Sequence, residues 1–266
     1  MTAVTLMTVP ALHAIDFDHA YRSFAAVLRT HVVGARVDYA ALQRNRAALD
    51  AVVEQFGRVA LSDFESWTTD ERIAYLVNAY NAFTLQAIVD HYPIDGGWLS
   101  FLRWAPRNSI KQIDGVWNER RWNVAGQALT LDDIEHGTLR AEYDEPRIHF
   151  ALNCASVSCP RLREEPYTAN ALNRQLMLAT RDFLASEHGA RVRADSIWVS
   201  SLFSWFGDDF VDKYAHLVDG GSAQERAALG VIATYGPKDA SQLAQSGRAR
   251  VEYLDYDWGL NDVGPR

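Results

Sequence analysis

The stretch that organises the chain is TTDERIAYLVNAYNAFTLQAIVDHYP, residues 68–93. Thr68 and Glu71 form the pattern of a capping box, in which a hydroxyl at the helix start and a carboxylate three residues later satisfy free backbone N–H groups. Pro93 cannot continue a helix because it has no N–H group. The stretch therefore predicts a long helix from Glu71 to about His91.

Helices also dominate the sequence on both sides of this stretch. Apolar periodicity and capping residues predict helices from Asp16 or Asp18 to Leu28, over Ala40–Phe56, over Leu131–Arg140 behind Thr130, over Thr168–Ser186, from about Asp208, and over Ala223–Tyr235. Short alternating segments predict strands at Val116–Asn118, Arg121–Val124 with Ala128–Leu129, Arg147–Leu152, Arg191–Arg193, Ile197–Val199 and Val251–Tyr256. Because the strands come as hairpins and do not alternate regularly with helices, we expect an α+β fold, mostly helical with a small, mainly antiparallel sheet.

The composition is that of one packed globule. The chain has 266 residues, of which 48% are hydrophobic and 23% charged, and no Gly-, Ser- or Pro-rich linker divides it. We therefore expect a single globular domain over residues 15–266. A formal net charge of −8 disfavours nucleic acids and anionic lipids as partners. Since no apolar run approaches the ~20 residues of a membrane span, we also expect no integral membrane segment.

The start of the chain, Met1–Ala14, is apolar and ends in small residues, as the core of a secretory signal does. No Lys or Arg precedes this core, and Leu12 is large for a position near a cleavage site. We expect a truncated signal segment and an exported protein, periplasmic or in the cell envelope. The alternative is an apolar terminus that packs on the domain.

The segment His149–Pro160, HFALNCASVSCP, has the sharpest chemical pattern. Alternation along the predicted strand places His149 and Asn153 on one face. Cys154 then starts a loop of small residues, which lets backbone amides approach a substrate. A thiolate at Cys154, kept ionised by an imidazole, would be a nucleophile. Other interpretations stay open: a redox pair with Cys159, part of a zinc site, a structural disulfide, or two buried thiols.

Two other segments supply partners for this cysteine. His136 lies on the short helix beside Glu135, and it is the first choice of base because it comes from a separate element. Two amides on one face of the long helix either tie down a neighbouring loop or act on a histidine or an oxyanion. We expect no metal and no cofactor, because no second pair of zinc ligands is evident. The predicted catalytic residues are Cys154, His136, His149, Asn81, Asn78 and Glu135.

Together these motifs resemble the family known as domain of unknown function 547. The matching stretches are Val37–Tyr39, Ala74–Ala82, Ile134–His136, His149–Pro160, Val199–Phe206, Asp208–Phe210 and Tyr256–Asp262. The resemblance implies an exported or envelope protein, as bacterial relatives commonly are. It also implies that Cys154 is the steadier of the two cysteines, because plant relatives often have Ser at the position of Cys159. It supplies no substrate and no reaction.

Two functions therefore stand as alternatives. The first is a cysteine hydrolase or acyltransferase, in which Cys154 attacks an amide or ester of a small-molecule or peptide substrate with an imidazole beside the sulfur. The second is a non-catalytic envelope or scaffolding domain, in which Cys154 and Cys159 form a structural pair. In that case the aromatic segments Trp98–Trp104 and Leu202–Phe206 would bind a peptide or glycan.

Overall fold

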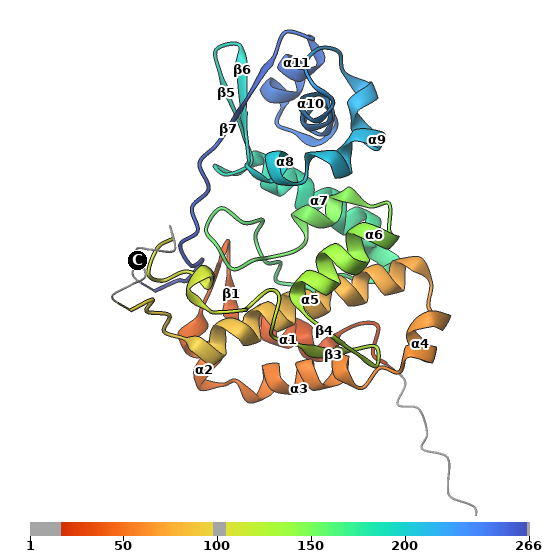
Figure 1. Ribbon diagram of the computed structural model, residues 1–266, viewed down its shortest axis with the longest axis vertical. Coiled ribbons are helices and arrows are strands. Elements are labelled where there is room, and N and C mark those ends of the chain that lie inside the picture. The colour runs from red at the N-terminus through yellow and green to blue at the C-terminus, as the bar shows by residue number, and fades with distance from the viewer. Residues whose placement is uncertain (1–16, 98–104, 265–266) are drawn as a thin grey trace, which may run out of the picture.

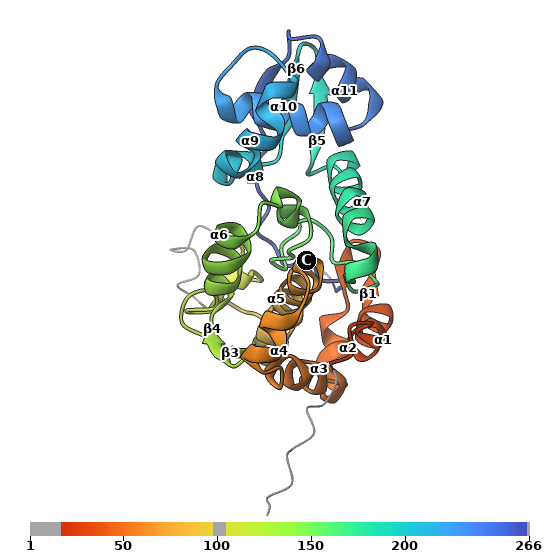
Figure 2. The same cartoon turned by 90° about the vertical axis from the view of Figure 1, so that its right-hand side faces the viewer.

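The chain is built around α5, Thr69–His91, in a computed structural model that describes residues 17–97 and 105–264 (Figure 1). Thr68 and Glu71 make both bonds of the capping box, so the predicted start of this helix is confirmed. A helix buried on all sides needs apolar side chains around its whole circumference. The run from Ile73 to Val89 supplies them, and other elements surround α5 in the molecule (Figure 2).

An N-terminal layer packs against α5. It contains α1 (Arg22–His31), β1 (Val32–Val33), β2 (Arg36–Val37), α2 (Tyr39–Arg44), α3 (Ala47–Gly57) and α4 (Leu61–Ser66). The prediction of a single helix over Ala40–Phe56 is wrong, because the helix is interrupted between α2 and α3. Asn45 follows α2 with φ −118° and ψ +33°, outside the helical region, so the helix ends before it. Asp18 accepts the Arg22 N–H at the start of α1, whereas Asp16 lies outside the described residues.

The middle of the chain consists of short elements. They are 3-10 helices at Ile110–Gln112, Pro146–Phe150 and Ala169–Ala171, strands β3 (Trp122–Val124) and β4 (Gln127–Leu129), a π-helix at Asp133–Leu139, and α6 (Arg140–Glu142). The Thr130 hydroxyl accepts the Asp133 N–H at 3.0 Å and so caps the predicted helix start at Leu131, from which the chain continues into the π-helix. The strand predicted over Val116–Asn118 is wrong, because these residues belong to turns that follow Gly115, where φ is +61°.

The strand predicted over Arg147–Leu152 is also wrong. The chain forms the 3-10 helix Pro146–Phe150 there. Proline presets a helical φ in the first turn of a helix, and the Glu145 carboxylate caps the turn by accepting the Arg147 N–H at 3.2 Å. His149 and Asn153 therefore do not share the face of a strand.

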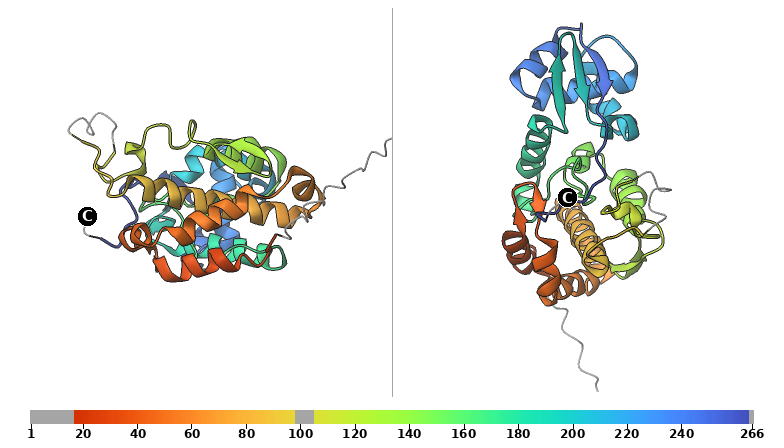
Figure 3. Two further views of the ribbon diagram at one scale, coloured as in Figure 1. Left: turned by 90° about the horizontal axis from the view of Figure 1, so that it is seen from below. Right: turned by 90° about the vertical axis from the view of Figure 1, so that its left-hand side faces the viewer.

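The C-terminal part forms a second body above α5. It contains α7 (Leu172–Ala185), β5 (Ala190–Arg193), β6 (Ser196–Val199), α8 (Leu202–Trp205), 3-10 helices at Gly207–Phe210 and Ala215–Leu217, α9 (Val211–Tyr214), α10 (Ala223–Tyr235), α11 (Lys238–Gln245) and β7 (Arg250–Tyr253). β5 and β6 are antiparallel as predicted, and β7 joins β6 in parallel (Figure 3). The described strands thus make three small, mainly antiparallel sheets, and the α+β class is confirmed.

Buried apolar side chains form two clusters, one around α5 and one around α10. Residues 254–263, which we call the strap, run from the second cluster back to the N-terminal layer (Figures 1 and 3). At its ends, Leu254 donates to the carbonyl of Val199 and Val263 to that of Val37. The strap therefore brings the end of the chain past the boundary between the clusters. Within the described ranges, no helix is both long and apolar enough to cross a membrane.

Candidate functional site

The loop that carries Cys154 is clamped from below by Asn81 of α5. The Asn81 side chain donates to the carbonyl of Ala151 at 3.0 Å and accepts the N–H of Asn153 at 2.8 Å. Asn78 makes the same pair of bonds to the backbone of Tyr167, at 2.7 and 2.9 Å. Both amides are buried, so these backbone groups have no access to water. The two asparagines thus hold loops in place and do not reach either sulfur by a hydrogen bond.

Asn153 closes the loop on itself. Its side-chain oxygen accepts the N–H of Ala155 at 3.1 Å, and its amide donates to the carbonyl of Pro160 at 2.7 Å. Ala155 is buried and has a φ of +59°, in the left-handed region that costs an alanine conformational energy. The surrounding bonds hold this residue in a strained conformation and so fix the direction in which the neighbouring Cys154 side chain leaves the backbone.

The strap holds the other side of the loop. Val157 donates to the carbonyl of Gly259 at 2.8 Å, and Ser156 pairs with Leu260 in an isolated antiparallel bridge. The N–H of Asp257 donates to the hydroxyl of Ser158 at 2.9 Å. These bonds place Tyr256, a strap residue, against the first cysteine.

Hydroxyl groups and a second thiol surround the sulfur of Cys154. Its Sγ lies 3.1 Å from the Ser156 hydroxyl and 3.3 Å from the Tyr256 hydroxyl. The Cys159 thiol beside it and these two hydroxyls lower the pKa of Cys154 to about 7, although burial acts against them. Burial and the neighbouring Cys154 raise the pKa of Cys159, whose sulfur accepts the N–H of Cys154 at 2.9 Å. Both thiols are free, and only Cys154 is poised to ionise near neutral pH.

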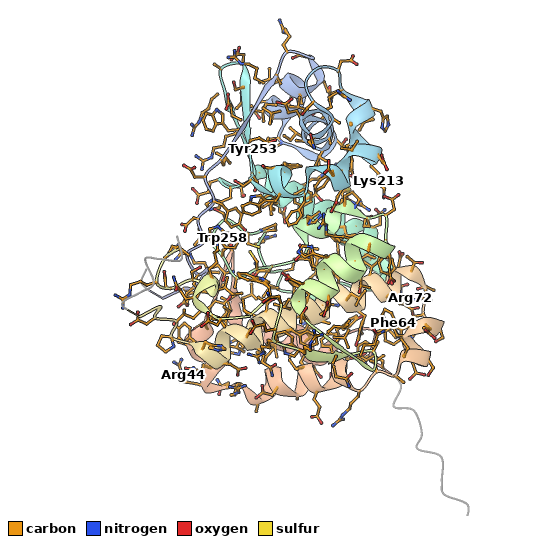
Figure 4. The ribbon with its side chains drawn as sticks, viewed as in Figure 1. Arg44, Phe64, Arg72, Lys213, Tyr253 and Trp258 are labelled. Atoms are coloured by element: carbon orange, nitrogen blue, oxygen red, sulfur yellow. The ribbon has the colours of Figure 1, made fainter. Side chains whose placement is uncertain are left out.

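Both cysteines line a pocket of about 210 Å³ between the two apolar clusters. There the rings of Trp205 and Trp258 stack with their centroids 5.7 Å apart, and Trp205 is 45% exposed. Figure 4 shows Trp258 between the upper and lower parts of the molecule. The other residues that line the pocket are Tyr80, Lys111, Trp117, Asp132, Glu135, His136, His149, Leu152, Pro160, Leu202, Phe206 and Tyr256.

His149 is held beneath the pocket by an acid that the sequence did not single out. Its Nε2 lies 2.7 Å from Asp209, and its ring stacks on Phe206 at 4.3 Å. Burial lowers the pKa of His149, so the neutral ring donates its Nε2–H to the carboxylate. Although burial opposes ionisation, hydrogen bonds from His149 and Arg140 hold the pKa of Asp209 well below its usual range. Arg140 binds this carboxylate through two nitrogens, at 2.6 and 2.9 Å.

His136 lies at the rim of the pocket, with its side chain 41% exposed. Arg140 donates to its Nδ1 at 3.0 Å, and Nε2 lies 3.8 Å from Asp132. A guanidinium has no acceptor, so Nδ1 must accept and the neutral ring carries its proton on Nε2. In the described part of the chain, no imidazole hydrogen-bonds to either sulfur. The histidines and Cys154 share a pocket without direct contact through a hydrogen bond.

Glu135 is the buried carboxyl group of the pocket. Its Oε1 lies 3.9 Å from Nδ1 of His149, and burial raises the pKa of the carboxyl group. The hydroxyl of Tyr80 lies beside it, and Tyr80 is also close enough to both cysteines for their charge to affect it. The wide turns of the π-helix thus set Glu135 inside the pocket and the next residue at its rim.

The structure brings together residues that sequence reasoning left without a role. Tyr256, Ser156, Asn153 and Asp209 all contact predicted site residues. Tyr256 stood in a stretch that matched the family pattern, but nothing local indicated its partner, which is 102 residues away. No group of three or more His, Cys, Asp or Glu suited to a metal occurs among residues 17–97 and 105–264.

The comparisons with known proteins agree with the resemblance noted in the sequence. No curated protein and no solved structure matches the chain. Residues 64–184 match the family described as "Protein of unknown function, DUF547". This range includes α5 with its two clamping asparagines, the π-helix and the cysteine loop. Over residues 64–184, the match bears out the DUF547 family expected from the motifs.

Proposed function

We propose that this protein is a cysteine-dependent hydrolase or acyltransferase that acts on an amide or ester of a small-molecule or peptide substrate, with Cys154 as the nucleophile. One observation carries the proposal: the sulfur of Cys154, with a pKa of about 7, lies in a pocket with aromatic walls. The thiolate is the attacking form of cysteine, and about half of it is present near neutral pH at this pKa. A purely structural thiol needs neither a low pKa nor access to a pocket.

The proposed reaction begins when the Cys154 thiolate attacks the carbonyl carbon. A carbon–sulfur bond forms, the bond to the leaving oxygen or nitrogen breaks, and a thioester remains. Water then releases the acyl group as an acid, or an amine or alcohol accepts it. The aromatic rings of Trp205 and Trp258 would bind the apolar part of the substrate.

Proton transfer falls to the carboxyl group of Glu135 in this proposal. Burial favours its protonated form, which can donate to the leaving group and afterwards take a proton from the attacking water. The sequence suggested His136 as the base, but a ring that carries its proton on Nε2 is suited to donate a hydrogen bond from that atom. We propose that His136 donates a hydrogen bond to the carbonyl oxygen as negative charge develops there.

An activated ester tests the nucleophile without knowledge of the natural substrate. We expect p-nitrophenyl acetate to leave one acetyl group on the wild-type protein, detected by intact mass, and peptide mapping to place it on Cys154. Cys154→Ser should not be acetylated under the same conditions, whereas Cys159→Ser should be. Acetylation that survives in Cys154→Ser, or none in the wild type, would refute the proposal. The latter result would favour the scaffolding alternative, in which the aromatic segments bind a peptide or glycan; of these, Leu202–Phe206 is described in the structure, whereas Trp98–Trp104 lies outside the described residues.

The proposed role of Glu135 has its own test within this system. p-Nitrophenolate leaves without help from an acid, whereas an alkoxide needs a proton. Glu135→Gln should therefore acetylate as fast as the wild type with the activated ester, but more slowly with an alkyl ester by about 10²-fold. Equal slowing with both esters would show that Glu135 supports only the structure of the site.

Export to the cell envelope is a separate proposal that rests on the sequence of Met1–Ala14 alone, which lies outside the described residues. Fusion of the N-terminal segment to a reporter that folds only after export would test it. Activity of the reporter is the expected result, and an inactive, cytosolic fusion would refute it.

A further inference from the structure

Two thiols of unlike character meet at the bottom of the pocket. The sulfur of Cys159 lies 2.9 Å from the backbone nitrogen of Cys154, and the Cys159 side chain contacts the Cys154 side chain. From this geometry we propose that Cys154 and Cys159 form a peroxide-reactive pair, in which a hydroperoxide oxidises Cys154 and Cys159 then closes a disulfide with it.

The first requirement of such a pair is an accessible, ionised thiol. Cys154 meets it, because it lines the pocket and because Cys159, Ser156 and Tyr256 together lower the pKa of its thiol. Of the two hydroxyls, that of Ser156 donates to that of Tyr256 at 3.0 Å, and both lie against the sulfur. Sulfenic acids form selectively at cysteines of this kind. A hydroperoxide is small enough to enter a pocket of about 210 Å³.

The second requirement is a resolving thiol that stays close to the first but is not itself oxidised. Burial and the neighbouring thiolate keep Cys159 protonated, so it is a poor nucleophile toward peroxide. The left-handed turn at Ala155 and the bond from Asn153 to Pro160 fold the loop so that its two cysteines come together.

The chemistry balances in two steps. In the first, the Cys154 thiolate attacks one peroxide oxygen; a sulfur–oxygen bond forms, the oxygen–oxygen bond breaks, and the departing alkoxide or hydroxide takes a proton. Cys154 is now a sulfenic acid. In the second, the sulfur of Cys159 attacks that of Cys154; the disulfide forms, and the hydroxyl group leaves as water with the proton of Cys159. Two thiols are oxidised and one hydroperoxide is reduced.

This pairing is independent of acyl transfer. It would hold in a scaffolding protein as well as in an enzyme. If Cys154 does attack carbonyl groups, however, the disulfide removes the nucleophile, and a thiol reductant restores it. Oxidation would then abolish acetylation of the wild type by p-nitrophenyl acetate until the protein is reduced.

Both cysteines lie in one tryptic peptide, Ile148–Arg161, so the test needs no cross-linked fragments. After treatment of the wild type with one equivalent of hydrogen peroxide, we expect this peptide to lose the mass of two hydrogens and the protein to lose both titratable thiols. A thiol reductant should restore them. Cys159→Ser should stop at the sulfenic acid, which dimedone traps on Cys154.

Cys154→Ser gives the matching control, and its Cys159 should keep its thiol at the same peroxide dose. A cooperative thermal unfolding transition checks that each variant is folded. If a variant does not fold, the peroxide treatment of the wild type still tests the proposal. The proposal is overturned if the wild type keeps two thiols, forms a disulfide only between chains, or carries a sulfinic acid at Cys154 without a disulfide.

Discussion

Replacement of Tyr256 by phenylalanine should weaken the Cys154 thiolate without disturbing the packing of the pocket. The substitution keeps the ring that packs against Trp205 and Trp258, and it removes only the hydroxyl 3.3 Å from the sulfur. The surroundings lower the pKa of Cys154 from 9.0 to about 7. That difference corresponds to about 3 kcal/mol in favour of the thiolate.

The Cys159 thiol contributes most to this lowering, and the hydroxyls of Ser156, 3.1 Å from the sulfur, and of Tyr256 contribute less. A hydrogen bond to a charged group contributes about 1.5–3 kcal/mol net, and the low end of this range suits a shared, longer bond. The pKa of Cys154 should then rise by roughly one, to about 8. At about pH 7 the thiolate fraction would fall from about a half to about a tenth, so alkylation should slow about fivefold.

The assay is the rate of iodoacetamide labelling of Cys154 as a function of pH, followed by mass spectrometry of the tryptic peptide. The midpoint should shift upward in Tyr256→Phe, whereas the limiting rate at high pH should be unchanged. Tyr253→Phe, which alters an exposed tyrosine of β7, is the matched control and should behave as the wild type. An unchanged midpoint in Tyr256→Phe, together with a raised midpoint in His136→Gln, would refute the reasoning and assign the thiolate to an imidazole.

Three further variants test the framework of the site. Asn81→Leu leaves a buried carbonyl and a buried N–H of the cysteine loop without partners, and each costs about 1–3 kcal/mol. The free energy of unfolding in urea should therefore fall by about 3 kcal/mol. The midpoint of Cys154 alkylation with pH should change as well. Asn78→Leu should cost a similar amount but leave the midpoint unchanged; identical midpoints in both variants would contradict the clamp. Asp209→Asn should destabilise the protein by about 2 kcal/mol near neutral pH, because the half-buried Arg140 guanidinium loses its charged partner and keeps only its bond to His136. The pKa of Asp209 is lowered in the folded state, so its contribution to stability is complete above the unfolded value near 3.8 and is lost as the pH falls further. The free energy of unfolding of the variant should therefore depend less on pH below about 4 than that of the wild type. An equal dependence would contradict this assignment.

The elements that the sequence predicted well are those with local signals. The capping box at Thr68 and Glu71 specifies the start of α5, and a second box at Ser222 and Glu225 starts α10. Both involve residues three positions apart, so a short window contains all the information. The hairpin of β5 and β6 is equally local, since a turn joins the two strands directly.

The errors arose where a local pattern competed with a less obvious one. The apolar alternation before the cysteine loop resembled a strand, but Pro146 and the Glu145 cap start a 3-10 helix there. Similarly, one apolar periodicity ran across α2 and α3, although the backbone leaves the helical conformation at Asn45. In both cases the side-chain periodicity was real, and the local backbone conformation decided the structure.

The site itself could be predicted only in part. Cys154, Glu135 and the two histidines do line one pocket. Their hydrogen-bond partners could not be found, because Asp209 and Tyr256 lie 60 and 102 residues from the side chains they contact. Contacts at such separations depend on the packing of the C-terminal body and the strap, and no pattern within a segment records them.

The arrangement of the histidines explains why hydroxyl groups stand beside the sulfur. Arg140 donates to His136 and to Asp209, and Asp209 in turn accepts from His149. Arg140 thus links the two imidazoles in one network. Neither ring hydrogen-bonds to the Cys154 sulfur in the described part of the chain, so neither forms the direct contact of a cysteine–histidine pair. The groups that lower the pKa of Cys154 are instead the Cys159 thiol and the hydroxyls of Ser156 and Tyr256, which lie 3.1 and 3.3 Å from the sulfur.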